Sequence, residues 1–313
     1  MRIVFMGSPD FAVPSLDILV KNGYDVVAVI TATDKYGGRG GKKLLKTPVK
    51  VYAEENNIPV LQPKNLKASE FIEELASYKA DVQIVVAFRM LPVVVWDMPQ
   101  HGTYNLHGSL LPKYRGAAPI NWAVVRGEKE TGVTSFKLKH AIDTGDFLFQ
   151  RKIKIGEDET AGELYERMRF LGAEVIHDTV KAIETGQLNL IPQDDSEATS
   201  APKIYRETCE INWNQDVSTV YNFIRGMSPF PTAWTTLDGL QFQITKCKKK
   251  ESDQALSPGQ VVIERTKKMK ISCANGYIIL EEVKLQGKRK MTVFDFLNGY
   301  KETTWEIGMK DDK

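Results

Sequence analysis

Two polar side chains separated by one residue, Asn105 and His107, are the first candidates for chemistry in this sequence. In a β-strand, residues two apart point to the same face, so the amide and the imidazole would lie side by side while Leu106 packs on the other face. An asparagine amide can donate to a developing oxyanion, and a histidine can move a proton near neutral pH. The same pair also fits a hydrogen-bonded core histidine and a turn asparagine, so the motif alone leaves both interpretations open.

A carboxylate for such a site could come from residues 141–146. Asp143 follows an apolar residue and precedes Thr-Gly, so a loop would place its carboxylate among apolar neighbours. Asp146 competes for the same role, and spacing does not choose between the two. Either aspartate could instead form an Asx-turn.

A third segment, residues 34–46, contains five basic residues, one acidic residue and four glycines, directly after a predicted strand. It is not a Walker loop, because Lys42 is followed by lysine rather than Ser or Thr, and the GxGxxG pattern of dinucleotide-binding turns is absent. Such a loop could bind a phosphodiester chain. It could equally be a solvated, flexible loop.

The elements that must position these residues alternate along the first half of the chain. Short β-rich runs alternate with segments of helical apolar spacing, which predicts an α/β, Rossmann-like fold with a mostly parallel sheet covered on both faces. Ligands bind such sheets at the carboxyl ends of the strands, where Asn105 and His107 would lie. A capping box at Thr160 and Glu163 begins a long helix that Gly186 ends. We predict strands at residues 2–6, 26–33, 82–87 and 103–107, and further helices at 11–20, 48–57 and 69–78.

The last third of the chain changes character. Residues 190–206 are polar and lack apolar periodicity, which is typical of a linker. A predicted helix at 215–226 then precedes short strand-like runs separated by turn signals, which indicate a small antiparallel, OB-like β-barrel. We therefore predict a first domain at residues 1–189, a linker at 190–206 and a C-terminal β-barrel domain at 207–313.

Positive charge is concentrated in this C-terminal part. Residues 246–290 contain 12 basic and 5 acidic residues, a net charge of +7, although the whole chain carries only +2. If the strands form a barrel, these lysines could converge on one face and contact a phosphate backbone. They could also protect exposed strand edges and turns.

The composition argues against several classes of protein. With 313 residues and 42% hydrophobic residues, the chain is long enough for two domains and too apolar to be disordered. Three widely spaced cysteines form no CxxC pair, which argues against a disulfide framework and a structural zinc site. No stretch approaches the roughly 18 apolar residues of a membrane span, and the apolar start is too short for a signal peptide. We expect a soluble protein of a reducing compartment.

One stretch of sequence resembles a known family. Residues 107–116, HGSLLPKYRG, resemble the HxSLLPxxRG element of the folate-dependent formyltransferases, and Gly132-Val133-Thr134 with Ile142-Asp143-Thr144-Gly145 is similar to their second signature. Three further features resemble the methionyl-tRNA formyltransferase family. They are residues 7–12, GSPDFA, like GTPxFA; residues 39–44, RGGKKL, like a GRGKKL-type loop with one additional glycine; and residues 228–234, SPFPTAW, which introduce a basic C-terminal domain.

The resemblance implies a formyltransferase fold for the first domain and a tRNA-binding C-terminal domain. It implies a cytoplasmic, monomeric enzyme of one-carbon metabolism and translation initiation, which uses 10-formyltetrahydrofolate and no metal to formylate methionyl initiator tRNA. It assigns Asn105, His107 and Asp143 as the catalytic residues and prefers Asp143 over Asp146. The folate pocket would be bordered by Phe88, Arg89, Met90, Leu91, Ser109, Leu110, Leu111 and Pro112. The tRNA would be contacted by Arg39, Lys42, Lys43, Lys246, Lys248, Lys249, Arg265, Lys268, Lys288 and Arg289.

Two alternatives differ in substrate or class. An enzyme of the same fold could formylate a small amine, such as glycinamide ribonucleotide or an amino sugar-nucleotide. The basic loop and the basic C-terminal domain argue against it. A non-catalytic RNA-binding protein could be built on a degenerate transferase, but the intact set of Asn105, His107 and Asp143 argues against that class.

Overall fold

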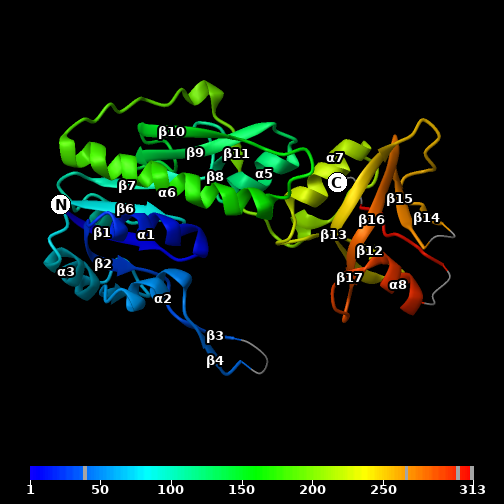
Figure 1. Ribbon diagram of the computed structural model, residues 1–313, viewed down its shortest axis with the longest axis horizontal. Coiled ribbons are helices and arrows are strands. Elements are labelled where there is room, and N and C mark those ends of the chain that lie inside the picture. The colour runs from blue at the N-terminus through cyan, green and yellow to red at the C-terminus, as the bar shows by residue number, and fades with distance from the viewer. Residues whose placement is uncertain (38–40, 265–266, 301–303, 311–313) are drawn as a thin grey trace. The chain divides into compact units, whose positions relative to one another are not determined.

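The computed structural model describes residues 1–37, 41–264, 267–300 and 304–310 (Figure 1). The chain separates into two compact units, and each is described by itself. Unit 1 comprises Met1–Gly116, Thr131–Ile153 and Tyr165–Ser200, and unit 2 comprises Ala117–Glu130, Lys154–Leu164 and Ala201–Lys313. The domain boundaries at residues 189 and 207 stay a prediction.

Unit 1 is built on a seven-stranded sheet, and its strands lie in the order β10 (Phe147–Lys154), β9 (Glu130–Lys137), β7 (Thr103–His107), β6 (Val82–Val86), β1 (Arg2–Gly7), β2 (Asp25–Ile30) and β5 (Val60–Leu61). β1 pairs in parallel with β2 and β6, β6 with β7, and β2 with β5, whereas β9 runs antiparallel to β7. The predicted α/β fold with a mostly parallel sheet is confirmed. β6 is apolar apart from the buried Gln83, because both faces of the sheet are covered.

Helices pack on the face of the sheet to which Val85 points. Phe71, Leu75 and Val95 form a core there with Val4 of β1 and Val85 of β6. These three side chains come from α3 and α4, so the two helices cover this face. The helices of unit 1 are α1 (Val13–Lys21), α2 (Pro48–Glu55), α3 (Ser69–Ser77), α4 (Val93–Trp96) and α6 (Ala161–Thr185), with the short 3-10 helices η1 (Asp10–Ala12) and η2 (Asp195–Glu197).

The long helix α6 covers the opposite face. A Cβ atom built on Gly172 would lie 2.6 Å from Cδ2 of Leu106 of β7, so helix and sheet approach closely here and a larger residue would have to displace that side chain. The predicted capping box begins the helix: Glu163 N–H donates to Thr160 Oγ1 at 3.2 Å, and Thr160 N–H donates to Glu163 Oε2 at 2.8 Å.

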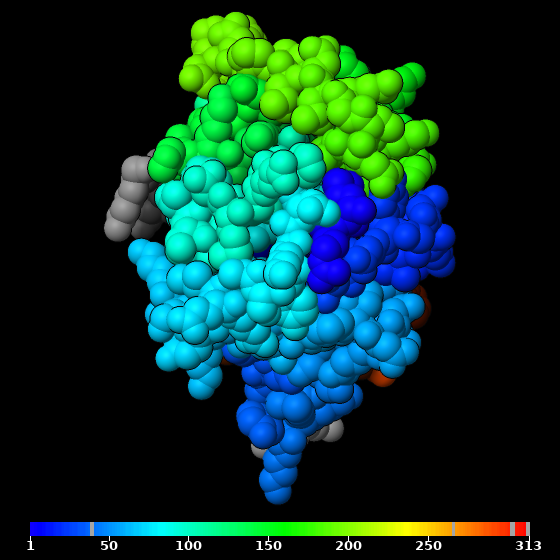
Figure 2. All heavy atoms as spheres, turned by 90° about the vertical axis from the view of Figure 1, so that its left-hand side faces the viewer, coloured from blue at the N-terminus to red at the C-terminus, as the bar shows by residue number. Residues whose placement is uncertain are grey.

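A two-stranded hairpin carries the basic loop. It consists of β3 (Lys35–Gly37) and β4 (Lys43–Leu45), and it extends from the lower end of unit 1, in blue (Figure 2). Its base is anchored by Asp34, whose carboxylate accepts from Lys50 Nζ at 2.6 Å and from Gln62 Nε2 at 2.8 Å. The hairpin is thus fixed where it leaves the sheet.

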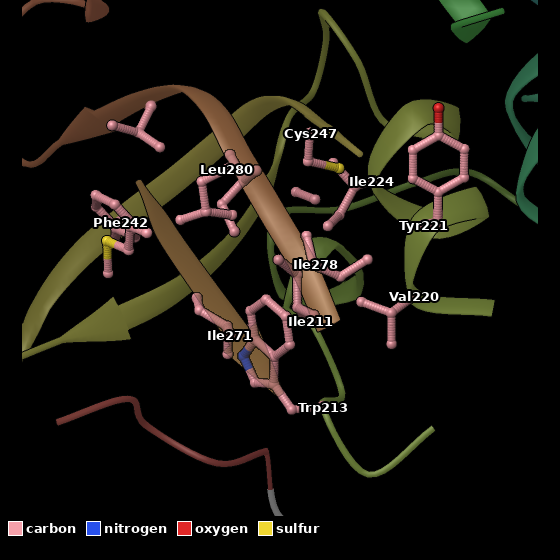
Figure 3. Packing of buried hydrophobic residues seen from close by; sticks show 14 of the residues in the cluster. Ile211, Trp213, Val220, Tyr221, Ile224, Phe242, Cys247, Ile271, Ile278 and Leu280 are labelled. Atoms are coloured by element: carbon pink, nitrogen blue, oxygen red, sulfur yellow. The ribbon is translucent and has the colours of Figure 1, made fainter. Parts of the chain in front are cut away.

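Unit 2 is built on an antiparallel sheet in the order β12 (Ala233–Leu237), β13 (Leu240–Glu251), β16 (Gly276–Leu285), β15 (Met269–Cys273) and β14 (Val261–Ile263), with β17 (Met291–Thr292) paired to β16. The predicted antiparallel C-terminal fold is confirmed. Trp213, Ile224, Ile271, Ile278 and Leu280 pack together in its core (Figure 3). The remaining elements of unit 2 are α5 (Pro119–Val125), α7 (Val217–Gly226), α8 (Val293–Gly299) and η3 (Glu207–Cys209). Unit 1 also contains the short strand β8 (Arg115–Gly116), and β11 (Ser200–Ala201) lies where a segment of unit 1 ends.

None of the helices in the described ranges combines the length and the apolar character that crossing a membrane requires.

Candidate active site

The Asn-x-His pair lies at the carboxyl end of β7, on one face of the sheet. Asn105 lies beside Val85 of β6 in the strand register, and His107 lies beside Thr134 of β9. His107 is only 6% exposed, whereas Asn105 is half-buried. Among the residues that the structure describes, the Asn105 amide has no hydrogen-bonding partner. Its N–H groups are therefore available to a ligand at this edge.

One ring nitrogen of His107 is hydrogen-bonded to the protein backbone. Nε2 lies 2.8 Å from the carbonyl oxygen of Tyr114. A carbonyl oxygen only accepts, so Nε2 carries a proton and donates it. Nδ1 is therefore the nitrogen that remains for proton transfer, and it lies 3.8 Å from Asp143 Oδ2. The structure brings His107 and Asp143 together with the carboxylate placed to stabilise a doubly protonated ring.

The side chain of Asp143, between β9 and β10, is positioned by the backbone conformation of the residue and by a hydrogen bond to its carboxylate. Its φ of 55° lies in the left-handed region, and its Oδ2 accepts from the backbone N–H of Gly116 at 2.9 Å. Gly116 has a φ of 123°, which favours glycine. The Asp143 side chain is 13% exposed, so its carboxylate is shielded from water but still reaches the site.

Asp146 has a different role. Its carboxylate accepts from Lys139 Nζ at 2.7 Å, and its carbonyl accepts from Lys137 N–H at 3.0 Å. These contacts return the loop to the end of β9. A Cβ atom on Gly145 would lie 1.7 Å from the Lys137 carbonyl oxygen, so the loop closes only with glycine there. The geometry favours Asp143 over Asp146 as the partner of His107.

The segment after His107 is folded onto β9 and β10. The Thr134 hydroxyl donates to the Ser109 carbonyl at 2.6 Å and accepts from Leu111 N–H at 3.1 Å. Gln150 Nε2 donates to the Leu111 carbonyl at 2.7 Å. The Ser109 hydroxyl donates to the Lys113 carbonyl at 2.5 Å. Ser109 and Leu111 are therefore buried and already bonded within the protein.

Leu110 and Pro112, the other predicted folate contacts of this segment, are half-buried. The sequence analysis did not single out Gln150, because an isolated glutamine in a strand carries no recognisable signal.

The second predicted folate segment follows β6. Phe88 and Leu91 are half-buried and pack against the core that α3 and α4 cover. The Arg89 guanidinium donates to the carbonyl oxygens of Pro63 and Lys64, the latter at 3.0 Å. Met90 is 71% exposed. Of these four predicted contacts, Arg89 and Met90 are exposed.

A cavity of about 610 Å³ lies next to the Asp143 loop. The ring of Trp96 meets the ring of His140 edge-on, with centroids 5.4 Å apart. The volume falls within the range of small-molecule sites. None of the eight predicted folate contacts lines it, and the sequence analysis did not single out Trp96. Its lining residues are Trp96, Asp97, Lys137, Leu138, Lys139, His140, Ala141, Thr144 and Asp146.

Known proteins match this chain over most of its length. Residues 1–180 match the family described as Formyl transferase, and residues 203–301 match Formyl transferase, C-terminal domain. A methionyl-tRNA formyltransferase of Parabacteroides distasonis is 46% identical over 312 residues, which cover 96% of each chain. One of Porphyromonas gingivalis is 47% identical over 311 residues, again 96% of each chain. This chain belongs to the methionyl-tRNA formyltransferase family.

Solved structures share the fold at much lower identity. HypX from Aquifex aeolicus, in complex with tetrahydrofolic acid, superposes with a TM-score of 0.66 at 19% identity over 98% of this chain, which spans 50% of HypX. A methionyl-tRNA formyltransferase from Clostridium thermocellum gives a TM-score of 0.56 at 15% identity and covers 91% of this chain and 98% of its own. At these identities the likeness concerns the fold alone.

The basic residues predicted to contact tRNA differ in their exposure to solvent and in whether they have an acidic partner. Lys42 and Lys43 are exposed on the β3–β4 hairpin, and Lys268, Lys288 and Arg289 are exposed in unit 2. Arg39 and Arg265 lie outside the described residues.

The lysines of β13 already have acidic partners. Lys248 Nζ lies 2.9 Å and Lys246 Nζ 3.9 Å from the Glu281 carboxylate. Lys249 Nζ lies 4.0 Å from Glu157 and above the ring of Tyr221. Lys246 and Lys248 are exposed as well, so among the predicted contacts the β13 lysines differ by their acidic partners and carry less uncompensated charge.

No group of three or more potential metal-binding side chains occurs within the described part of the chain. The thiols of Cys209, Cys247 and Cys273 are buried. Burial raises the pKa of all three, that of Cys273 to about 12, so they are poor nucleophiles at neutral pH.

Proposed function

We propose that this family member transfers the formyl group of 10-formyltetrahydrofolate to the α-amine of methionine on initiator tRNA, giving N-formylmethionyl-tRNA for translation initiation. The observation that carries the proposal is the site at the end of β7. There a half-buried amide, which has no hydrogen-bonding partner among the described residues, lies two residues from an imidazole whose Nδ1 faces a carboxylate. Cytoplasmic location and a monomeric state stay predictions.

In this mechanism each side chain has one task. The Asn105 amide donates to the oxygen of the formyl group as negative charge develops when the amine attacks the formyl carbon. His107 accepts a proton from the attacking amine at Nδ1, while Nε2 keeps its bond to Tyr114. Asp143 stabilises the resulting imidazolium. The same proton can then return, directly or through water, to the departing folate nitrogen as its bond to the formyl carbon breaks.

Residues that line the cavity can contribute to folate binding in addition to the predicted contacts. The cavity beside the Asp143 loop has room for a bicyclic ring, and Trp96 and Leu138 give it apolar walls. Carboxylates of Asp97 and Asp146 and backbone groups of the loop can bind the donor and acceptor edges of a pterin. We add these residues to the predicted folate contacts at 88–91 and 109–112.

Exposed basic residues support a tRNA substrate. Lys42 and Lys43 can bind the acceptor-arm phosphates, and the exposed lysines of unit 2 can bind phosphates without base specificity.

The direct test uses the intact protein with 10-formyltetrahydrofolate and charged tRNA. Formylmethionyl-tRNA is followed on an acid gel with charged initiator tRNA, charged elongator tRNA and glycinamide ribonucleotide as parallel acceptors. We expect product with the initiator and little with the other two. Efficient formylation of a small amine in place of the initiator would favour the alternative substrate class, and no formyl transfer to any acceptor would contradict the proposal.

A further inference from the structure

Residues 193–199, which follow α6, contact the surroundings of both His107 and Asp143, the candidate catalytic pair. We propose that Gln193 and Thr199 are positioning residues for this pair: Gln193 holds the loop of Asp143, and Thr199 holds the backbone that anchors His107. The proposal rests on the function proposed above. All of the residues involved belong to unit 1.

The side-chain amide of Gln193 is fully used. Its Nε2 donates to the carbonyl oxygen of Asp143 at 2.8 Å and to that of Gly145 at 2.7 Å. Its Oε1 accepts from Arg115 Nε at 3.2 Å and Nη2 at 2.7 Å. A flipped amide would turn its N–H groups toward the donors of Arg115, so the partners fix its orientation. One glutamine thus ties the Asp143 loop to the segment that follows His107.

The contacts of Gln193 lie where the loop is strained. Asp143 has a φ of 55°, a conformation that L residues rarely adopt, and it persists only where the surroundings determine it. Gln193 binds the carbonyl of Asp143 itself and that of the residue two positions later. In the polar stretch of residues 191–197, Gln193 alone is half-buried, whereas the others are exposed. A solvated linker residue would not show this pattern.

Thr199 acts in the same way on the other partner. Its Oγ1 accepts from Tyr114 N–H at 2.9 Å, and its carbonyl accepts from Arg115 N–H at 2.8 Å. Tyr114 is the residue whose carbonyl binds His107 Nε2, and it also has a left-handed φ, 62°. This one segment therefore holds both residues with a left-handed φ at the site: Asp143, which belongs to the catalytic pair, and Tyr114, which binds His107.

The distance between His107 and Asp143 depends on the contacts of Gln193 and Thr199. His107 Nδ1 and Asp143 Oδ2 are 3.8 Å apart, and no direct hydrogen bond between them sets that distance. A displacement of about 1 Å in a catalytic group can reduce a rate by about 100-fold. Neither Gln193 nor Thr199 needs to touch a substrate to have this effect.

The test compares variants of similar side-chain size that lose hydrogen bonds of Gln193 or Thr199. Gln193→Met loses both N–H donors, and Gln193→Glu loses them but keeps an oxygen for Arg115. Thr199→Val loses the acceptor for Tyr114, whereas Thr199→Ser restores it. The control is Ser196→Ala in the same segment, which removes an exposed hydroxyl that donates to Asp194 Oδ1 at 2.7 Å and binds neither Arg115 nor the Asp143 loop. Circular dichroism and thermal melts confirm that each variant is folded before its rate is measured.

We expect Gln193→Met, Gln193→Glu and Thr199→Val to reduce kcat by about 10- to 100-fold. KM for folate and for tRNA should stay within about twofold, because positioning acts on the transition state rather than on binding. The pH profile of kcat should shift in these variants, whereas Thr199→Ser and Ser196→Ala should resemble the parent protein. A folded variant with unchanged kcat, or with raised KM alone, would overturn the positioning role.

Asp143→Asn in the same assay separates the two proposals. If it loses activity while Gln193→Met and Thr199→Val keep theirs, the positioning role is wrong and the proposed site stands. If Asp143→Asn itself keeps full activity, the proposed site is wrong, and the positioning role is wrong with it.

Discussion

Asn105 differs from the polar residues around it because its amide is not used to hold the fold. Ser109 and Thr134 bind backbone groups, and His107 has one nitrogen committed to Tyr114. In the described structure, only the amide of Asn105 among these polar side chains is left without a protein partner. An unused donor beside a held imidazole is what oxyanion stabilisation requires.

Replacing Asn105 with alanine should therefore affect the rate far more than the stability. We expect Asn105→Ala to reduce kcat by about 100- to 1,000-fold, the usual cost of one lost oxyanion donor, with the melting temperature nearly unchanged. Single-turnover formylation and a thermal melt measure the two quantities. Asn22→Ala, at the exposed end of α1, is the control and should keep the parent rate. Turnover within about threefold of the parent would remove Asn105 from the mechanism.

At the scale of elements, the loop between β9 and β10 is closed by a glycine that no other residue can replace without movement. A Cβ atom on Gly145 would lie 1.7 Å from the Lys137 carbonyl oxygen. Gly145→Ala should displace the loop and Asp143 with it. Because about 1 Å of displacement can cost about 100-fold in rate, kcat should fall by that order.

Gly186→Ala is the matched control for this prediction. Gly186 ends α6 with a φ of 70°, and nothing lies within 4 Å of its added Cβ atom. Alanine there should lower the free energy of unfolding by about 1 kcal/mol and leave kcat unchanged. Steady-state rates and urea unfolding of both variants distinguish a displaced loop from general destabilisation. Equal kcat values for the two variants would contradict the role of Gly145.

The packing of α2 against α1 makes a pH-dependent contribution to stability. Tyr52 OH donates to Asp17 Oδ1 at 3.0 Å, and burial, with help from this bond, raises the pKa of Tyr52 to about 12. Between pH 10 and 12 the unfolded tyrosine is ionised while the folded one keeps its proton. The unfolded state therefore binds fewer protons, and the contribution is lost as the pH rises through this window.

Tyr52→Phe removes the pH-dependent contribution of Tyr52 to stability. The free energy of unfolding of this variant should therefore fall less steeply between pH 10 and 12. Urea unfolding of both proteins at several pH values measures the difference, and the curves should run parallel between pH 7 and 9. Parallel curves up to pH 12 would show that Tyr52 ionises equally in both states.

The elements that the sequence predicts well are those with a local signal. The capping box at Thr160 and the apolar run of β6 need no distant contact to be recognised, and both are confirmed. β9 and β10 are missed, because polar residues interrupt their apolar pattern. The left-handed φ of Asp143 and the bonds of Gln193 are invisible in sequence, since both depend on residues that are far apart along the chain.

At the scale of the whole molecule, the net charge of +2 conceals a local excess of positive charge in unit 2. Lys246 and Lys248 share Glu281, and Lys290 pairs with Glu282 at 2.7 Å, so part of the positive charge of unit 2 is already compensated. Exposed cations without such partners gain most from a phosphate, because they lose no internal ion pair when they bind it. Sequence counts alone do not separate the two groups, since pairing is set by strand register.

Binding of initiator tRNA should therefore depend steeply on salt, and the exposed hairpin lysines should contribute to that slope. We expect Lys42→Ala and Lys43→Ala each to lower the slope of log K against log salt by about 1, with affinity falling alike for initiator and elongator tRNA. Lys21→Ala is the control, because Lys21 is equally exposed but pairs with Asp17 at 2.9 Å. Filter binding between low and physiological salt gives the slopes. Affinity that does not change with salt would mean that phosphate contacts do not hold the tRNA, and an unchanged slope in both hairpin variants would place those contacts on unit 2.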